Sequence, residues 1–185
     1  MLPTPRREEV LSIDQVNQME RGQFVATFGP LFQGAAWIAE QAWDAHPFED
    51  VYDLRRAFHD ALFEAPADRQ LELIRRYPDL AGPATREGRL PTQSVVDQAI
   101  AGLDRLSGDE YSSFDSLNRA YREKFGFPLV IAVRENTKET ILRTGNARLQ
   151  NSPAAEQATA LVEIAKIANL RLLDLVEEPV DQPVA

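Results

Sequence analysis

Apolar residues at helical spacing run through almost the whole chain and constrain the fold more than any other feature. The predicted helices cover residues 13–44, 50–65, 65–77, 93–106, 108–126, about 136–148 and 153–176. Gly22, Gly29 and Pro30 are expected to divide the first stretch into two or three short helices. Residues 127–133 are β-branched and apolar, but a single strand has nothing to pair with, so we expect a buried extended segment. The pattern predicts an all-α fold, a single-domain multi-helix bundle.

The chain has 185 residues, which is enough for one domain with a substantial core. We expect an N-terminal extension over residues 1–12, a helical domain over 13–176 and a flexible tail over 177–185. The sequence contains no internal repeat that would divide the domain further.

Composition excludes several classes of function. The formal net charge is −9, so no broad basic surface is expected for nucleic acid, although one or two arginines in a pocket can still bind a small anion. No apolar run approaches the roughly 20 residues of a membrane span, and the N-terminus lacks a secretory signal, which fits a cytoplasmic protein. The chain has no cysteine and two histidines, so a metal site would need unusual ligands.

The segment 78–92 is rich in proline and glycine and is expected to be a loop between two helices, a favourable place for a site. Ser94 is expected to cap the following helix, with Asp97 three residues later as a variant of the capping box. Phosphate-binding loops, HExxH motifs and nucleophile elbows are absent. The residues alone therefore indicate a soluble helical domain and do not identify a reaction.

Six motifs in a fixed order give the sequence a resemblance to a known family. They are FGPLFQGAAWIAEQAW (28–43), HPFED (46–50), YPDLAG (77–82), SVVDQAIAGLDRL (94–106), FDSLNRAYREKFGFPLVIAVR (114–134) and RLQNSPAAEQATALVEIAKIANLRLLDLV (148–176). Together they resemble the 2-oxo-4-hydroxy-4-carboxy-5-ureidoimidazoline (OHCU) decarboxylases of urate degradation, over about residues 15–176. The resemblance implies an all-α homodimer without cofactor that converts a heterocyclic carboxylate to allantoin. No cofactor is needed because the substrate's own C=N bond can accept the electron pair left by CO₂.

The resemblance also implies a set of site residues. The family loop reads His-Pro-Asp-Leu and its histidine acts as acid and base; here Tyr77 stands at that position, and Asp97 replaces a glutamate as the second catalytic position. The implied substrate-binding residues are Pro78, Ser94, Gln98, Leu129, Val130, Ile131, Ala132, Val133 and Arg134. A phenol has a reference pKa of ~10 against ~6.5 for imidazole, so Tyr77 is a proton donor rather than a base. Without the resemblance, Tyr77 could equally be a half-buried aromatic residue and Asp97 a helix-start carboxylate.

Three functions stay open on this basis. The first is decarboxylation of OHCU or of a substituted ureidoimidazoline. The second is a different lyase, isomerase or hydrolase that acts on a related nitrogen heterocycle, because one scaffold can support several reactions. The third is a homologue that has lost catalysis and acts by binding.

Overall fold

The computed structural model describes residues 10–178, and the predicted all-α fold is confirmed. The helices are α1 (Ile13–Asn17), α2 (Arg21–Phe28), η1 (Gly29–Phe32), α3 (Ala36–Ala42), η2 (Trp43–Ala45), α4 (Val51–Phe63), α5 (Ala67–Arg75), α6 (Pro83–Arg86), α7 (Thr92–Ile100), α8 (Gly108–Phe125), η3 (Val133–Glu135), α9 (Lys138–Arg148) and α10 (Pro153–Leu173). Within the described residues, β-pairing is limited to an isolated parallel bridge between Leu11 and Val176.

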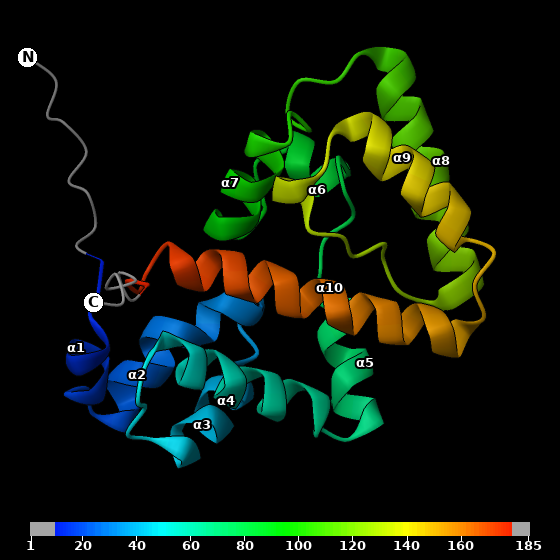
Figure 1. Ribbon diagram of the computed structural model, residues 1–185. Helices are drawn as coiled ribbons and strands as arrows, with labels where there is room; N and C mark the ends of the chain where they lie inside the picture. Colours follow the sequence, from blue (N-terminus) through cyan, green and yellow to red (C-terminus); the bar gives the residue numbers. More distant parts are fainter. Residues whose placement is uncertain (1–9, 179–185) are drawn as a thin grey trace, which may run out of the picture. The chain divides into compact units, whose positions relative to one another are not determined.

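The helices form two compact units (Figure 1). The first unit contains the residues up to Glu64 together with those from Ala168 onward, and the second contains Ala65–Ile167. Helix α10 is shared, because its first part belongs to the second unit and its last turns belong to the first.

The first unit is built around an aromatic core. The ring of Phe24 lies 4.7 Å from that of Phe28 and 6.0 Å from that of Phe58, so α2 and α4 meet through aromatic side chains. Residues far apart in the sequence also meet here, since Arg171 Nη1 donates to the Leu31 carbonyl at 3.0 Å. The first unit therefore depends on residues from both ends of the chain.

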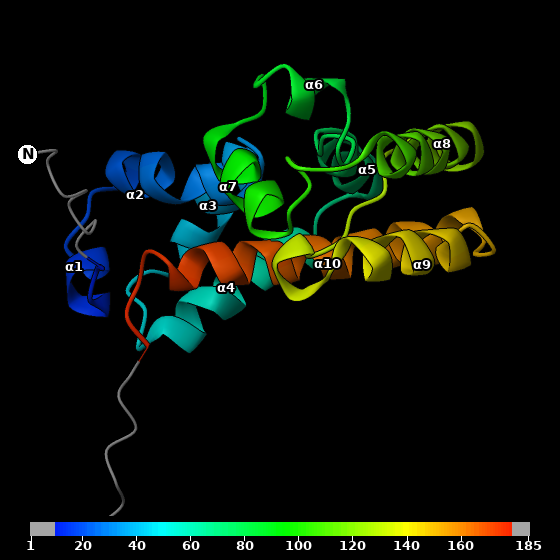
Figure 2. The same ribbon diagram turned by 90° about the horizontal axis from the view of Figure 1, so that it is seen from above.

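The second unit contains the long helix α8, whose two ends follow the sequence signals. Ser107 and Glu110 form a capping box at its start, and Gly126 ends it in the left-handed conformation at φ 73°. Helix α8 packs against α9, and the two can be followed in Figures 1 and 2. Gly145 of α9 leaves room for Leu117 of α8, because a Cβ at position 145 would lie 2.7 Å from Leu117 Cδ2. The segment 127–133, predicted to be buried and extended, is buried and has no strand pairing, but its last residue, Val133, belongs to the 3-10 helix η3.

Three local predictions need correction. The helix predicted over 93–106 is α7, which is shorter than predicted because it ends at Ile100. A turn with Gly102 at φ 73° follows it. The proposed N-cap Ser94 lies inside α7 and is buried, so that assignment is wrong; Pro91, whose fixed φ suits a helix start, holds the cap position. The predicted loop over 78–92 contains the helical turn α6.

The predicted terminal segments are described only in part, because residues 1–9 and 179–185 lie outside the described residues. At the start of the predicted tail, the Glu177 N–H donates to the Leu11 carbonyl at 2.9 Å. Both the extension and the tail therefore contain residues that belong to the first unit.

Candidate active site

Helix α7 buries polar residues and exposes apolar ones, the reverse of an ordinary amphipathic helix. Asp97 is 5% exposed, whereas Ile100 on the same helix is 59% exposed. The buried residues of α7 are Ser94, Asp97 and Gln98, and the exposed large apolar residues are Val95, Val96 and Ile100. Three of the predicted site residues therefore share one buried face, where polar groups require hydrogen-bond partners.

Asp97 is paired with Arg134, which the sequence had placed beside the buried segment. Arg134 Nε donates to Asp97 Oδ1 at 2.5 Å, and the two side chains are 17% and 7% exposed. The pair joins α7 to η3, two elements that contact each other in the second unit. A charge-assisted hydrogen bond at this depth fixes the direction of the guanidinium group.

Gln98 connects α7 to the loop that follows Tyr77 and Pro78. Its Oε1 accepts hydrogen bonds from the Ala81 N–H at 3.1 Å and from Thr85 Oγ1 at 2.9 Å. Ala81 has φ 50°, a left-handed conformation that is uncommon for alanine, so the loop needs this support.

Asn118 of α8 also binds the loop that follows Tyr77, and it was not identified from the sequence. Its Nδ2 donates to the Leu80 carbonyl at 2.9 Å, and its Oδ1 is buried without a hydrogen-bond partner among the described residues. Tyr77 itself is 6% exposed with a buried hydroxyl oxygen, and Pro78 is partly buried. The loop thus brings Tyr77 into the interior of the second unit.

The predicted substrate-binding segment Leu129–Val133 is held by side chains at alternate residues. Arg148 Nη1 donates to the Val130 carbonyl at 3.0 Å. The Ala132 N–H donates to Glu163 Oε2 at 2.8 Å, and Asn136 Nδ2 donates to the Ala132 carbonyl at 2.9 Å.

The backbone groups opposite these contacts have no hydrogen-bond partner among residues 10–178. In a trans peptide the N–H and C=O point in opposite directions, so the Ile131 N–H, the Ile131 C=O and the Val133 N–H face away from the three side chains. None of the three forms a hydrogen bond with a described residue. Buried backbone groups normally have partners, so these two donors and one acceptor are candidates for hydrogen bonds to a ligand.

Arg148, which holds the Val130 carbonyl, also belongs to a buried ion pair that was not identified from the sequence. Arg148 Nη2 lies 2.5 Å from Glu156 Oε1, and the two side chains are 10% and 0% exposed. Glu156 also accepts from Asn151 Nδ2 at 2.8 Å and from the Tyr121 hydroxyl at 3.1 Å. Burial raises the pKa of Tyr121. The sequence signal was two charges eight residues apart at a helix junction, which is weak without a contact between them.

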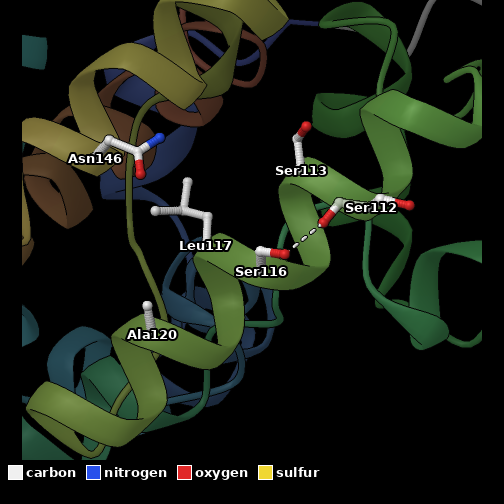
Figure 3. Close-up of a pocket in the computed structure, with 6 residues that line it drawn as sticks. All are labelled: Ser112, Ser113, Ser116, Leu117, Ala120 and Asn146. Carbon is white, nitrogen blue, oxygen red and sulfur yellow. Dashed lines mark hydrogen bonds between the residues drawn. The ribbon is translucent and has the colours of Figure 1, made fainter.

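The second unit has two surface grooves, and the second of them is lined in part by Asn136, the residue that holds the Ala132 carbonyl. The first, of about 410 Å³, is lined by the α8 residues Ser112, Ser113, Ser116, Leu117 and Ala120 and by Asn146 of α9 (Figure 3). Each of its serines donates to a carbonyl of its own helix, as Ser116 does to Ser112 at 2.9 Å, so the hydroxyl hydrogens are already used. The second, of about 380 Å³, lies beside Ile100 and Lys138. Neither is lined by a predicted site residue.

No cluster of three or more potential metal ligands occurs among residues 10–178. The two histidines belong to the first unit, where His46 stacks on Trp43 at 4.1 Å. Within the same residues, no helix combines the length and apolarity that crossing a membrane requires.

Comparison with known proteins decides the family. The sequence matches the family described as OHCU decarboxylase over residues 17–173. The chain belongs to the OHCU decarboxylase family. A 2-oxo-4-hydroxy-4-carboxy-5-ureidoimidazoline decarboxylase from Haloferax volcanii is 39% identical over 164 residues, which cover 89% of this chain and 95% of the relative.

Two solved structures are also similar. A crystal structure of (S)-allantoin synthase has a TM-score of 0.73 and 27% identity and covers 90% of this chain; this chain spans about half, 54%, of that one. A crystal structure of OHCU decarboxylase in the presence of (S)-allantoin has a TM-score of 0.66 and 22% identity over 80% of this chain and 96% of that chain, which shows the shared fold. The OHCU decarboxylase fold thus covers both units.

Proposed function

We propose that this protein decarboxylates OHCU, or a ureidoimidazoline with a substituted ring, to allantoin or its analogue in purine degradation. Family membership over residues 17–173 is the observation that carries the proposal. The paired and largely buried side chains of Asp97 and Arg134 support it, together with the burial of Ile131 three residues before Arg134.

The reaction needs little more than orientation and one proton. The bond between the carboxylate and the ring carbon breaks, its electron pair forms a double bond within the ring, and the C=N electrons move onto nitrogen. CO₂ leaves, and the ring nitrogen that received the electrons takes up a proton, which is the one proton of the net reaction. A proton is then added to the carbon that carries the ureido group, while the adjacent hydroxyl loses its proton and becomes a carbonyl. Binding must hold the carboxylate out of the ring plane and direct the proton to one face.

We assign the roles as follows. Tyr77 is the proton donor, because its phenol O–H has a proton to give. Arg134 binds an anionic oxygen of the substrate, while Asp97 holds the guanidinium in place at 2.5 Å. The Ile131 N–H and C=O and the Val133 N–H bind the ring and the ureido group. The buried side chains of Leu129 and Val133 exclude water from the carboxylate.

The decisive experiment generates OHCU from urate immediately before use and follows its decay by circular dichroism. We expect the protein to accelerate the decay and to yield optically active allantoin. Decay at the rate of buffer alone, with a racemic product, would refute the proposal for OHCU. Parallel assays with ring-methylated urates then distinguish an altered substrate from an inactive protein.

We further propose that the protein acts in the cytoplasm as a homodimer. The exposed apolar residues Val95, Val96 and Ile100 of α7 support an interface, because clustered exposed apolar side chains favour association. Light scattering at micromolar concentration should give a mass near twice 20.8 kDa. A mass near that of one chain would refute the dimer.

A further inference from the structure

Glu163 of α10 has one carboxylate oxygen on a backbone N–H of the predicted substrate-binding segment. Its Oε2 accepts the Ala132 N–H at 2.8 Å, and its Oε1 pairs with Lys166 Nζ at 2.8 Å. The Glu163 side chain is 12% exposed, whereas that of Lys166 is 47% exposed. Only the Ala132 contact reaches into the buried segment, since Ala132 is 1% exposed.

The geometry points to Glu163 as a positioning residue for the decarboxylation, an inference that rests on the proposed function. The Ala132 N–H and the Ile131 C=O belong to one rigid peptide unit and point in opposite directions. By holding the N–H, Glu163 directs the Ile131 carbonyl to the opposite side, where the substrate is expected. Glu163 acts through this peptide and does not touch the substrate.

The alternative states of this peptide explain why the contact matters. A peptide unit can turn about its two flanking bonds without moving the rest of the chain, and such a turn would reverse the Ile131 carbonyl. Asn136 holds only the next carbonyl, at Ala132, and Arg148 holds only the previous one, at Val130. Among residues 10–178, Glu163 is therefore the residue whose side chain fixes the peptide unit between Ile131 and Ala132.

The test compares variants that remove the acceptor with variants that keep it. Glu163→Ala removes the acceptor, Glu163→Gln keeps an oxygen but loses the charge, and Lys166→Gln removes the exposed partner while leaving Glu163 intact. Steady-state turnover of freshly generated OHCU is measured for each, together with amide hydrogen exchange of Ala132 by NMR. Should Glu163→Ala not fold, Glu163→Asp, which is one methylene shorter, takes its place.

For Glu163→Ala we expect kcat/KM to fall on the order of 10²-fold, shared between a higher KM and a lower kcat, because a misplaced binding group affects both. Exchange of the Ala132 amide should become faster. Glu163→Gln should recover activity to within about 5-fold, and Lys166→Gln should match the wild type, because both keep the acceptor.

Three outcomes would overturn the inference: unchanged kinetics in Glu163→Ala, equal losses in the alanine and glutamine variants, or an equal loss in Lys166→Gln. Failure of the wild type to accelerate OHCU decay would instead refute the proposed function. In that case the Ala132 exchange rate alone decides whether Glu163 fixes the peptide, and unchanged exchange in Glu163→Ala overturns it.

Discussion

Replacing Glu156 with glutamine should be among the most destabilising isosteric changes in this protein. The carboxylate is fully buried and accepts hydrogen bonds from Arg148, Asn151 and Tyr121. Glutamine has almost the same shape, but it removes the negative charge and turns one acceptor oxygen into an amide donor. Arg148, 10% exposed, is then left with an uncompensated charge in the interior.

The expected loss follows from that uncompensated charge. Removing one partner of a buried ion pair costs about 3–5 kcal/mol, and the remaining oxygen of glutamine places this variant near the lower limit, about 3 kcal/mol. For a domain of this size, 1 kcal/mol lowers Tm by about 2–4 °C, so we expect a decrease of about 6–12 °C. The same substitution at Glu72, whose partner Arg76 is exposed, should change stability by no more than about 0.5 kcal/mol.

Calorimetry and urea unfolding of Glu156→Gln, Glu72→Gln, Arg148→Met and the double variant at Glu156 and Arg148 provide the measurement. The double variant should lose less free energy of unfolding than the sum of the losses in its two single variants. The reason is that each single variant leaves one unpaired buried charge, whereas the double variant leaves none. A Tm for Glu156→Gln within about 2 °C of wild type, or additive losses in the double variant, would refute this account of the pair.

The other predictions concern the candidate donor and two titrating side chains. Tyr77→Phe should lower kcat on the order of 10²-fold while changing stability by at most about 1–2 kcal/mol, and unchanged turnover of the true substrate would exclude a chemical role for the hydroxyl. If the pocket has been altered for another substrate, Tyr77→His combined with Asp97→Glu should raise OHCU turnover. Burial raises the pKa of Tyr121, so the neutral form of this side chain is favoured in the folded state. The free energy of unfolding should therefore fall as pH rises above about 10, where tyrosine ionises in the unfolded chain. Tyr121→Phe should weaken this pH dependence in urea unfolding at alkaline pH. Burial lowers the pKa of His59, so stability should decrease as pH falls below about 6.5, and His59→Gln should weaken this dependence in thermal melts at pH 5–7.

Local signals in the sequence predicted the helices well. The apolar stripe of α4 and the glycine at the end of α8 both act within a few residues, and both were found where expected. The assignment of Ser94 as a helix cap failed because Pro91 offers a competing start three residues earlier. Local rules cannot decide between two adjacent start signals when burial of the side chain favours one of them.

The candidate site was predictable only through resemblance, and its supporting residues were not. Tyr77, Asp97 and Arg134 carry no spacing that separates a site from a solvated surface, and the pairing of Asp97 with Arg134 spans 37 residues. The Glu163 contact with Ala132 spans 31 residues. Such contacts depend on how the helices pack, which residue patterns along one helix do not specify.

The return of the last turns of α10 to the first unit determines when this protein can finish folding. Proteins usually fold from the N-terminus as the ribosome releases the chain. Here Leu11 pairs with Val176, and Arg55 Nη1 donates to Asn169 Oδ1 at 3.2 Å, so Leu11 and Arg55 cannot complete their contacts until residues 169–176 have been synthesised. Residues 65–167 lie between them in the chain and form the second unit. The second unit can therefore form before residues 168–176 are synthesised, whereas the first unit cannot close until they are. A truncation near residue 168 should consequently destabilise the helices formed by residues 13–63, although it leaves their own sequence intact.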